Sequence, residues 1–242
     1  MLVSEFDFPL PEKLIAQEAV PRGESRMLLL DRASGALHDA RVDQLPSFLQ
    51  AGDVLVVNNT RVFAARLLGH RVPSGGAVEC LLLRKISAAP SGAETWEALM
   101  HPGQKLKAGA VVRFENGVER IDGEVLDRHF FGRRTIRLTP AGGDHLDTLI
   151  DRIGHIPLPP YIKRADTLAD RDRYQTVFAE QRGSVAAPTA GLHFTPAILD
   201  GARHVGVHCV EITLHVGYGT FKPIRTERVE EHAVDPEHYE IG

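Results

Sequence analysis

The sequence predicts an α/β core domain, a mixed sheet with flanking helices, that carries an inserted small antiparallel β-barrel of about six strands. Helical and strand-like segments mix near both ends of the chain, whereas residues 62–140 contain only short strand-like segments between glycine and proline turns. The charge changes in the same place: residues 61–137 hold 13 basic and 8 acidic side chains, although the whole chain has a net charge of −4. We therefore expect the core domain over 1–61 and 141–242 and the barrel over 62–140.

The first part of the core domain is expected to supply its central strand. Residues 53–57 are apolar after the first position, which is typical of a strand buried on both faces. Residues 26–31 predict a shorter buried strand, and residues 43–49 predict a short helix. Apolar side chains at residues 6–15 are expected to anchor the N-terminus.

The barrel prediction depends on six strand-like segments that follow one another at short intervals. Turn sequences such as Pro-Ser-Gly-Gly and Glu-Asn-Gly separate them, and no segment between them has a helical period. The expected strands span residues 62–68, 77–84, 95–100, 111–115, 120–126 and 133–138.

The last part of the chain returns to mixed structure. Apolar residues at helical spacing predict helices over 144–153 and 169–179. The Thr-Pro pair at 195–196 predicts the start of a third helix, which Gly206 would end. Residues 207–216 predict a strand that leads into a glycine-rich loop.

Composition and motifs exclude several classes of function. The sequence has no phosphate-cradling or dinucleotide glycine motif, no zinc-ligand spacing and no serine nucleophile elbow, so no metal site is expected. No apolar run approaches the roughly 18 residues of a membrane span, and no signal sequence is apparent. Cys80 and Cys209 lie in apolar runs and are expected to be buried thiols of a cytoplasmic protein.

The first candidate site segment follows the apolar strand directly. It consists of Asn58, Asn59, Thr60 and Arg61. Ligands of open α/β sheets bind beyond the carboxyl ends of strands, and two amides, a hydroxyl and a guanidinium can hold a polar molecule or a phosphate. The alternative is a capped turn, because Asn and Thr are favoured in turns.

The second candidate segment is rich in small residues. Such residues allow a ligand to approach the backbone, and the helix that follows offers free N–H groups to an anion. The alternative is a tight packing turn with a histidine satisfied in the core. The candidate residues are Pro188, Thr189, Ala190, Gly191 and His193.

The third candidate segment is the strand at 207–216 with its loop. Strand alternation places Glu211, Thr213 and His215 on one face, where a histidine can act as a general base. The alternative is a polar solvent face followed by a turn. The loop adds the candidate binding residues Gly217, Gly219 and Lys222.

Together these segments resemble the S-adenosylmethionine:tRNA ribosyltransferase-isomerase family, and the resemblance extends along nearly the whole chain. Three motifs carry it in order: NNTRV, AAPTAGLHF and TLHVG-x-GTF, which begin at Asn58, Ala186 and Thr213. The family is known to combine an α/β domain with an inserted barrel. It moves the ribosyl part of S-adenosylmethionine onto 7-aminomethyl-7-deazaguanine at the tRNA wobble position, forming epoxyqueuosine and releasing adenine and methionine.

The resemblance also implies partners and residue roles. S-adenosylmethionine is a co-substrate, no tightly bound cofactor is expected, and the tRNA partners have GUN anticodons. Either His193 or His215 is the base. Asn58, Asn59 and Arg61 would hold ribose, base or phosphate, the backbone of residues 189–191 would receive the methionine carboxylate, and Glu211 would balance the sulfonium. The basic barrel would bind the anticodon stem-loop.

Family members usually continue beyond the position of Gly242 with further core strands and two pocket segments. We therefore expect this chain to lack that region. Separately, we expect the protein to act as a monomer. One alternative is an RNA-binding fragment that keeps the barrel and lacks catalysis. A further alternative is another S-adenosylmethionine-using enzyme that shares the core.

Overall fold

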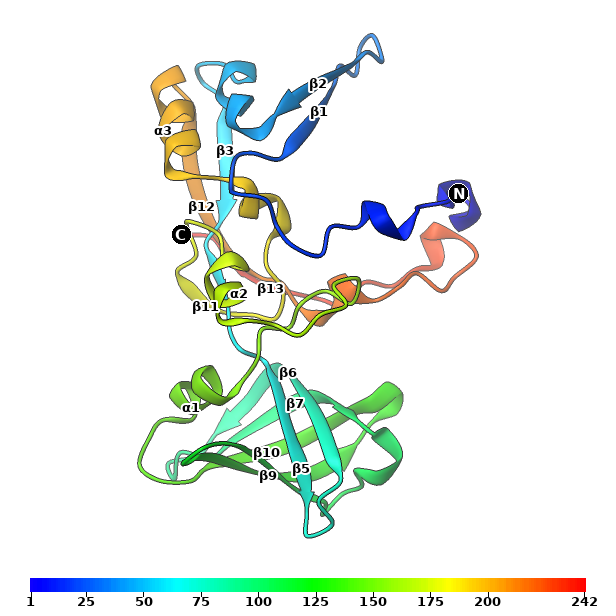
Figure 1. The fold of residues 1–242 in the computed structure, drawn as a ribbon, viewed down its shortest axis with the longest axis vertical. Coiled ribbons are helices and arrows are strands. Elements are labelled where there is room, and N and C mark those ends of the chain that lie inside the picture. Colours follow the sequence, from blue (N-terminus) through cyan, green and yellow to red (C-terminus); the bar gives the residue numbers. More distant parts are fainter. The chain divides into compact units, whose positions relative to one another are not determined.

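The computed structural model describes residues 1–242, and their contacts divide the chain into two units (Figure 1). The core unit comprises residues 1–61 and 159–242, and the barrel unit comprises residues 62–158. The chain therefore leaves the barrel unit 18 residues after the expected boundary at 140. The difference is the segment that contains helix α1 (Leu146–Ile153), which packs against the barrel strands.

The core unit contains a small mixed sheet. Strand β3 (Val54–Asn58) pairs in parallel with β12 (His208–His215), and β13 (His238–Glu240) pairs antiparallel with β12. Helix α3 (Pro196–Val205) runs beside β12 in Figure 1. Mixed strands with few helices confirm the predicted class of the core, but β3 lies at the sheet edge, so the prediction of a central strand was wrong.

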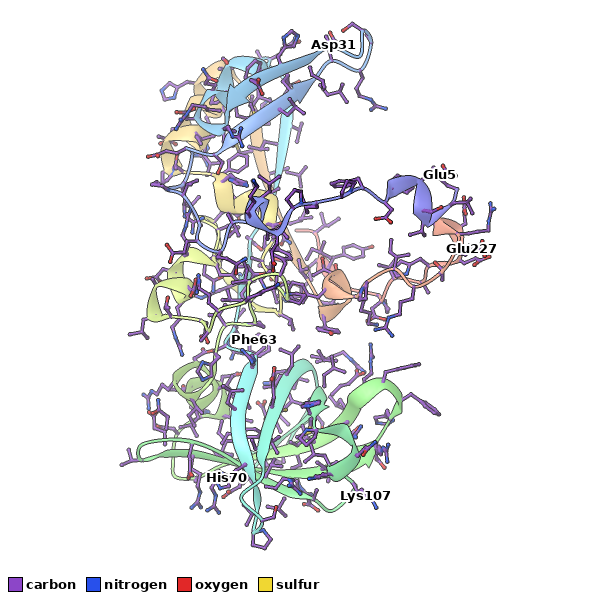
Figure 2. The ribbon with its side chains drawn as sticks, turned by 45° about the vertical axis from the view of Figure 1, so that its right-hand side comes forward. Glu5, Asp31, Phe63, His70, Lys107 and Glu227 are labelled. Carbon is purple, nitrogen blue, oxygen red and sulfur yellow. The ribbon has the colours of Figure 1, made fainter.

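The N-terminal hairpin and the segment after it complete one side of the core unit. Strand β1 (Arg26–Leu30) pairs antiparallel with β2 (Leu37–Arg41), and Asp31 lies at the hairpin tip in Figure 2. The expected short helix is the 3₁₀ helix η3 (Val42–Phe48). Pro46 lies inside it, and because proline has no N–H to donate, one backbone hydrogen bond of the helix is absent at that position.

Several apolar side chains that the sequence predicts to be buried are exposed. Leu28 and Leu30 of β1 are 62% and 55% exposed, because a two-stranded hairpin leaves one face uncovered. Val54 and Val56, which alternate onto one face of β3, are also exposed. The apolar residues near the N-terminus are also mostly exposed, and Val3 pairs with the backbone of Glu227 instead (Figure 2).

Helix ends in the core unit follow local signals. Thr195 caps α3 by accepting the Ile198 N–H at 3.2 Å, and Gly206 ends the helix with a φ of 98°, as predicted. Helix α2 (Leu168–Arg173) stops earlier than expected. The chain after it turns so that the amides of residues 180 and 181 pair with the Asn59 carbonyl.

The barrel unit is a closed antiparallel barrel of six strands, which confirms the prediction. The strand order is β10-β7-β6-β5-β8-β9. Its first strand begins at Arg66 rather than at residue 62, because residues 62–65 form a buried link before it. The strands are β5 (Arg66–Val72), β6 (Ala77–Ala88), β7 (Glu94–His101), β8 (Val111–Asn116), β9 (Glu119–Arg128) and β10 (Arg133–Pro140).

Helix α1 closes one face of the barrel unit. Its buried side chains, at the spacing the sequence predicts, are Leu146, Leu149, Ile150 and Ile153. Gly154 ends it, but with extended backbone rather than a left-handed turn. A Cβ there would lie 2.1 Å from the Ala64 carbonyl oxygen, so this glycine allows a close backbone approach.

The other sequence-based expectations concern thiols and membranes. Cys80 is fully buried, as expected, and burial raises the pKa of its thiol far above the ordinary value. Cys209 is only half-buried. No helix of the structure combines the length and the apolar character that a membrane crossing requires.

Candidate functional site

Asn58 ties together the two parallel strands of the core unit. Its side-chain amide donates to the Leu214 carbonyl at 2.8 Å, and its side-chain oxygen accepts the Leu214 N–H at 3.0 Å. These bonds continue the ladder between β3 and β12 beyond the end of β3. The contacts of Asn58 are therefore to backbone, and they fix the carboxyl ends of both strands relative to each other.

Asn59 connects two side chains on one face of β12. Its amide nitrogen donates to a Glu211 carboxylate oxygen at 3.2 Å, and its amide oxygen accepts the Thr213 hydroxyl at 2.7 Å. Asn59 is 9% exposed, whereas Glu211 is exposed. The structure thus brings together three sequence-predicted residues and holds a carboxylate at the solvent boundary.

Thr60 lies at the centre of a second cluster. Its hydroxyl is 2.8 Å from the Ser184 hydroxyl and 2.8 Å from Nδ1 of His215. Thr60 and Ser184 are both buried, on the two-stranded sheet of β4 (Thr60–Val62) and β11 (Gln181–Ser184). The sheet thereby places two buried hydroxyls behind the half-buried imidazole.

Backbone groups at both ends of this cluster favour one direction for its hydrogen bonds. The Val216 N–H donates to the Ser184 hydroxyl oxygen at 2.8 Å, so the Ser184 proton is free to donate to Thr60. The Thr60 proton has the Gln181 carbonyl as an acceptor at 3.4 Å. When both hydroxyl protons are used in this way, Nδ1 of His215 donates to Thr60 and Nε2 keeps its lone pair.

The surroundings of His215 favour its neutral form. Burial lowers the pKa of His215 below the ordinary 6.5, and the nearby His238 lowers it further, while Glu240 acts in the opposite direction. The two imidazole rings stack with centroids 6.2 Å apart. Gly183 also faces the His215 ring: a Cβ there would lie 2.6 Å from it. This glycine therefore leaves the space that the ring occupies.

The small-residue segment joins the site at one end. The N–H groups of Val185 and Ala186 both donate to the Val216 carbonyl, at 2.9 and 3.2 Å. The segment continues into the 3₁₀ helix η6 (Thr189–His193), where Thr189 and Ala190 are exposed. The expected free helix start is therefore a single 3₁₀ turn that precedes α3.

The other residues of the second candidate segment either contact the protein itself or make no hydrogen bond. Pro188 accepts the Gly191 N–H at 2.8 Å in the 3₁₀ turn. A Cβ on Gly191 would lie 2.8 Å from the Thr176 side chain, so this glycine packs against the protein itself. His193 is exposed and has no hydrogen bond. Of the two candidate histidines, His215 alone belongs to the connected cluster.

The glycine-rich loop after β12 is held by acidic residues. The Gly217 N–H donates to Glu237 at 2.8 Å, and Lys222 forms an ion pair with Asp235. Gly219 packs against Asp235. Arg61 is exposed and makes no ion pair. The loop residues thus have partners within the protein, whereas the Arg61 guanidinium is available to an anion.

Sequence reasoning missed three residues that organise the site. Gly183 and Ser184 lie shortly before the small-residue motif, and a glycine followed by a serine gives no separate signal. Arg22 donates to the carbonyls of Leu192 and Gln175, at 2.8 and 2.5 Å, and so fixes η6 from a distant part of the chain. No group of His, Cys, Asp and Glu side chains in the structure has the arrangement of a metal site.

The fold and the site define an α/β protein with a polar cluster at the carboxyl ends of parallel strands, in a chain that also forms a closed barrel. The family model described as "Queuosine biosynthesis protein" matches residues 3–242. The chain belongs to this family.

Two sequence relatives agree with this assignment. The S-adenosylmethionine:tRNA ribosyltransferase-isomerase of Solibacter usitatus is 48% identical over 100% of this chain and 71% of its own length. The protein of the same name from Desulfitobacterium hafniense is 46% identical over 100% of this chain and 68% of its own length. A crystal structure of S-adenosylmethionine tRNA ribosyltransferase from Thermotoga maritima is 28% identical and covers 88% of this chain and 58% of that chain, with a TM-score of 0.34.

Proposed function

We propose that this chain transfers and isomerises the ribosyl group of S-adenosylmethionine onto 7-aminomethyl-7-deazaguanine at the tRNA wobble position, giving epoxyqueuosine-tRNA, adenine and methionine. The observation that carries the proposal is the polar cluster at the ends of β3 and β12. Over its whole length, the chain that forms this cluster matches 71% and 68% of the lengths of two proteins named S-adenosylmethionine:tRNA ribosyltransferase-isomerase. Family membership supports the reaction class, and the geometry supports the following division of roles.

His215 serves as the general base. A base needs an unprotonated nitrogen, a fixed ring and a pKa near or below the working pH. The hydrogen bond from Nδ1 to Thr60 fixes the ring and leaves the lone pair of Nε2 free, while burial keeps the ring neutral. Nε2 accepts a proton from C5′ of S-adenosylmethionine, which the adjacent sulfonium acidifies, and the electron pair stays on that carbon.

The neighbouring cluster binds the cationic co-substrate. The Glu211 carboxylate is exposed and oriented by Asn59, so it can balance the sulfonium charge without a basic residue competing for it. Exposed backbone at Thr189 and Ala190 receives the methionine carboxylate. Arg61, which has no ion pair, contacts a phosphate.

The tRNA partner is a GUN-anticodon tRNA, whose anticodon stem-loop contacts the barrel unit. The excess of basic side chains between residues 61 and 137 supports phosphate contacts there. The chain acts as a cytoplasmic monomer, without a metal or a tightly bound cofactor.

The test is release of labelled adenine from S-adenosylmethionine in the presence of tRNA that carries the aminomethyl base. The wild-type chain and His208→Gln should release adenine, whereas His215→Gln should lose activity by about 10²-fold or more, the usual contribution of a general base. His208 is a matched control, since it is exposed on the same strand. Binding of tRNA without adenine release in the wild type would support an RNA-binding fragment and refute the enzyme.

A further inference from the structure

The barrel unit has a cavity that the proposed catalytic site does not use. Its volume is about 430 Å³, and it lies between two short 3₁₀ turns, η4 (Gly103–Lys105) and η5 (Phe130–Gly132). The cavity combines basic and aromatic side chains, and no acidic side chain lines it. Its basic and aromatic lining residues are Arg128, His129, Phe130, Phe131 and Arg134.

The cavity contains a buried positive charge without a counter-ion. Arg134 is 1% exposed, and its guanidinium donates to the carbonyls of Leu106 at 2.8 Å, of Arg133 at 2.7 Å and of Gly103. None of its partners is a carboxylate. Burial, together with the nearby Arg128, accordingly lowers the pKa of Arg134. Carbonyl oxygens satisfy the N–H groups but leave the net charge, which attracts an anion to the cavity.

The rim of the cavity presents two aromatic rings to solvent. Phe130 and Phe131 are 86% and 93% exposed, and their ring centroids are 6.4 Å apart. Phe131 also has a φ of 56°, a left-handed conformation that bulky residues rarely adopt. Packing within the barrel unit does not compensate for the exposed rings or for the unfavourable φ of Phe131. A ligand bound against the rings would explain both features.

Further basic side chains lie on or beside the segments that line the cavity. Arg128 lines the cavity and makes no ion pair, and Lys105 and Lys107 are exposed without acidic partners. Figure 2 shows Lys107 on a loop of the barrel unit. Among the sequence neighbours of Lys105, Lys107 and Arg128, the one acidic residue is Asp127, directly before Arg128. The segments that line the cavity therefore carry an excess of positive charge.

We propose that this cavity binds an unpaired nucleotide of RNA, with its base stacked on Phe130 or Phe131 and its phosphate attracted by Arg128 and Arg134. Aromatic rings beside cationic side chains are the combination by which proteins hold single-stranded nucleic acid. A protein partner would match the rings but would not need the uncompensated charge. The identity of the RNA as a tRNA rests on the proposed function, whereas the stacking site does not.

The test measures affinity of the full chain for two RNAs, a hairpin with an unpaired loop and a duplex of the same composition. We expect tighter binding of the hairpin. The double variant Phe130→Ala/Phe131→Ala should weaken hairpin binding at least about fivefold, the loss of one stacked base, and leave duplex binding unchanged. Arg128→Ala should reduce the slope of log affinity against log salt by about 0.7, the value for one phosphate contact on a single strand.

Two variants on the barrel unit serve as controls. Val118→Ala truncates a fully exposed apolar side chain at another hairpin tip, and Arg84→Ala removes a largely exposed cation from the barrel wall. Neither should change the preference for the hairpin. Equal affinity for both RNAs, or equal effects of the Phe130/Phe131 double variant and the Val118 variant, would overturn the stacking site. The binding assay does not depend on adenine release. Failure of the proposed reaction is therefore distinguished from failure of the proposed stacking site.

Discussion

Replacement of Thr60 by valine tests the hydroxyl cluster behind His215. Valine keeps the shape of threonine but removes the atom that contacts Ser184 and Nδ1 of His215, each at 2.8 Å. The Ser184 hydroxyl, which is fully buried, then has no acceptor. A buried polar group without a partner costs about 1–3 kcal/mol, so we expect Thr60→Val to lower the free energy of unfolding by about 2 kcal/mol.

The same replacement should change the tautomer of the His215 ring, that is, which ring nitrogen carries the proton. Without Thr60 as an acceptor, the proton is no longer held on Nδ1, and the lone pair of Nε2 is no longer assured. Adenine release at saturating substrates should fall by about 10²-fold, while binding of S-adenosylmethionine changes less. Nitrogen chemical shifts of the His215 ring, measured by NMR, report the tautomer directly.

A matched control separates this effect from the loss of a hydroxyl in general. Thr139→Val removes an exposed hydroxyl on a barrel strand and should leave the unfolding free energy and the His215 spectrum unchanged. The reasoning would be refuted by equal unfolding free energies for the two variants in urea, or by a wild-type spectrum with the proton on Nε2.

Three further predictions concern the core unit. Gly183→Ala should displace the His215 ring, because its Cβ would lie 2.6 Å away, and adenine release should fall by about 10²-fold without loss of tRNA binding. Asp170→Asn removes a carboxylate that accepts from both Arg164 nitrogens at 2.7 and 2.8 Å, so the unfolding free energy measured in urea should fall by about 1–2 kcal/mol. Since the Arg164 hydrogen bond lowers the pKa of Asp170 from 3.8 to about 2, its stabilisation is present above pH 3.8 and is lost between pH 4 and pH 2, a slope that Asp170→Asn should lack. The lowered pKa of His215 likewise makes stability fall as the pH drops below 6.5, and His215→Gln should remove that part of the slope in denaturation series at successive pH values.

Much of the candidate site was predictable because its residues follow regular elements. Asn59 comes directly after an apolar strand, and the alternation along β12 places Glu211 and Thr213 on one face. Parallel strands bring their carboxyl ends to the same edge, so these residues meet. Local pattern and sheet geometry together account for the contacts of Asn59 with both side chains.

The remaining parts of the site depend on contacts between distant segments. Ser184 contacts Thr60 across 124 positions of sequence, and no local pattern marks a serine as such a partner. The same holds for Arg22, which reaches Leu192 across 170 positions. The choice of His215 over His193 also required the tertiary structure, because both residues lie in similar apolar surroundings in the sequence.

The sequence by itself determined the barrel, the mixed core and the C-terminal ends of helices α1 and α3, because strand alternation, turn residues and caps act over a few neighbouring positions. Only the tertiary structure decided that β3 lies at an edge, that Gly154 and Gly183 make room for a carbonyl and an imidazole, and that buried Arg134 has no counter-ion. Burial and hydrogen-bond partners are properties of segments far apart in the chain, and they arise only when those segments pack together.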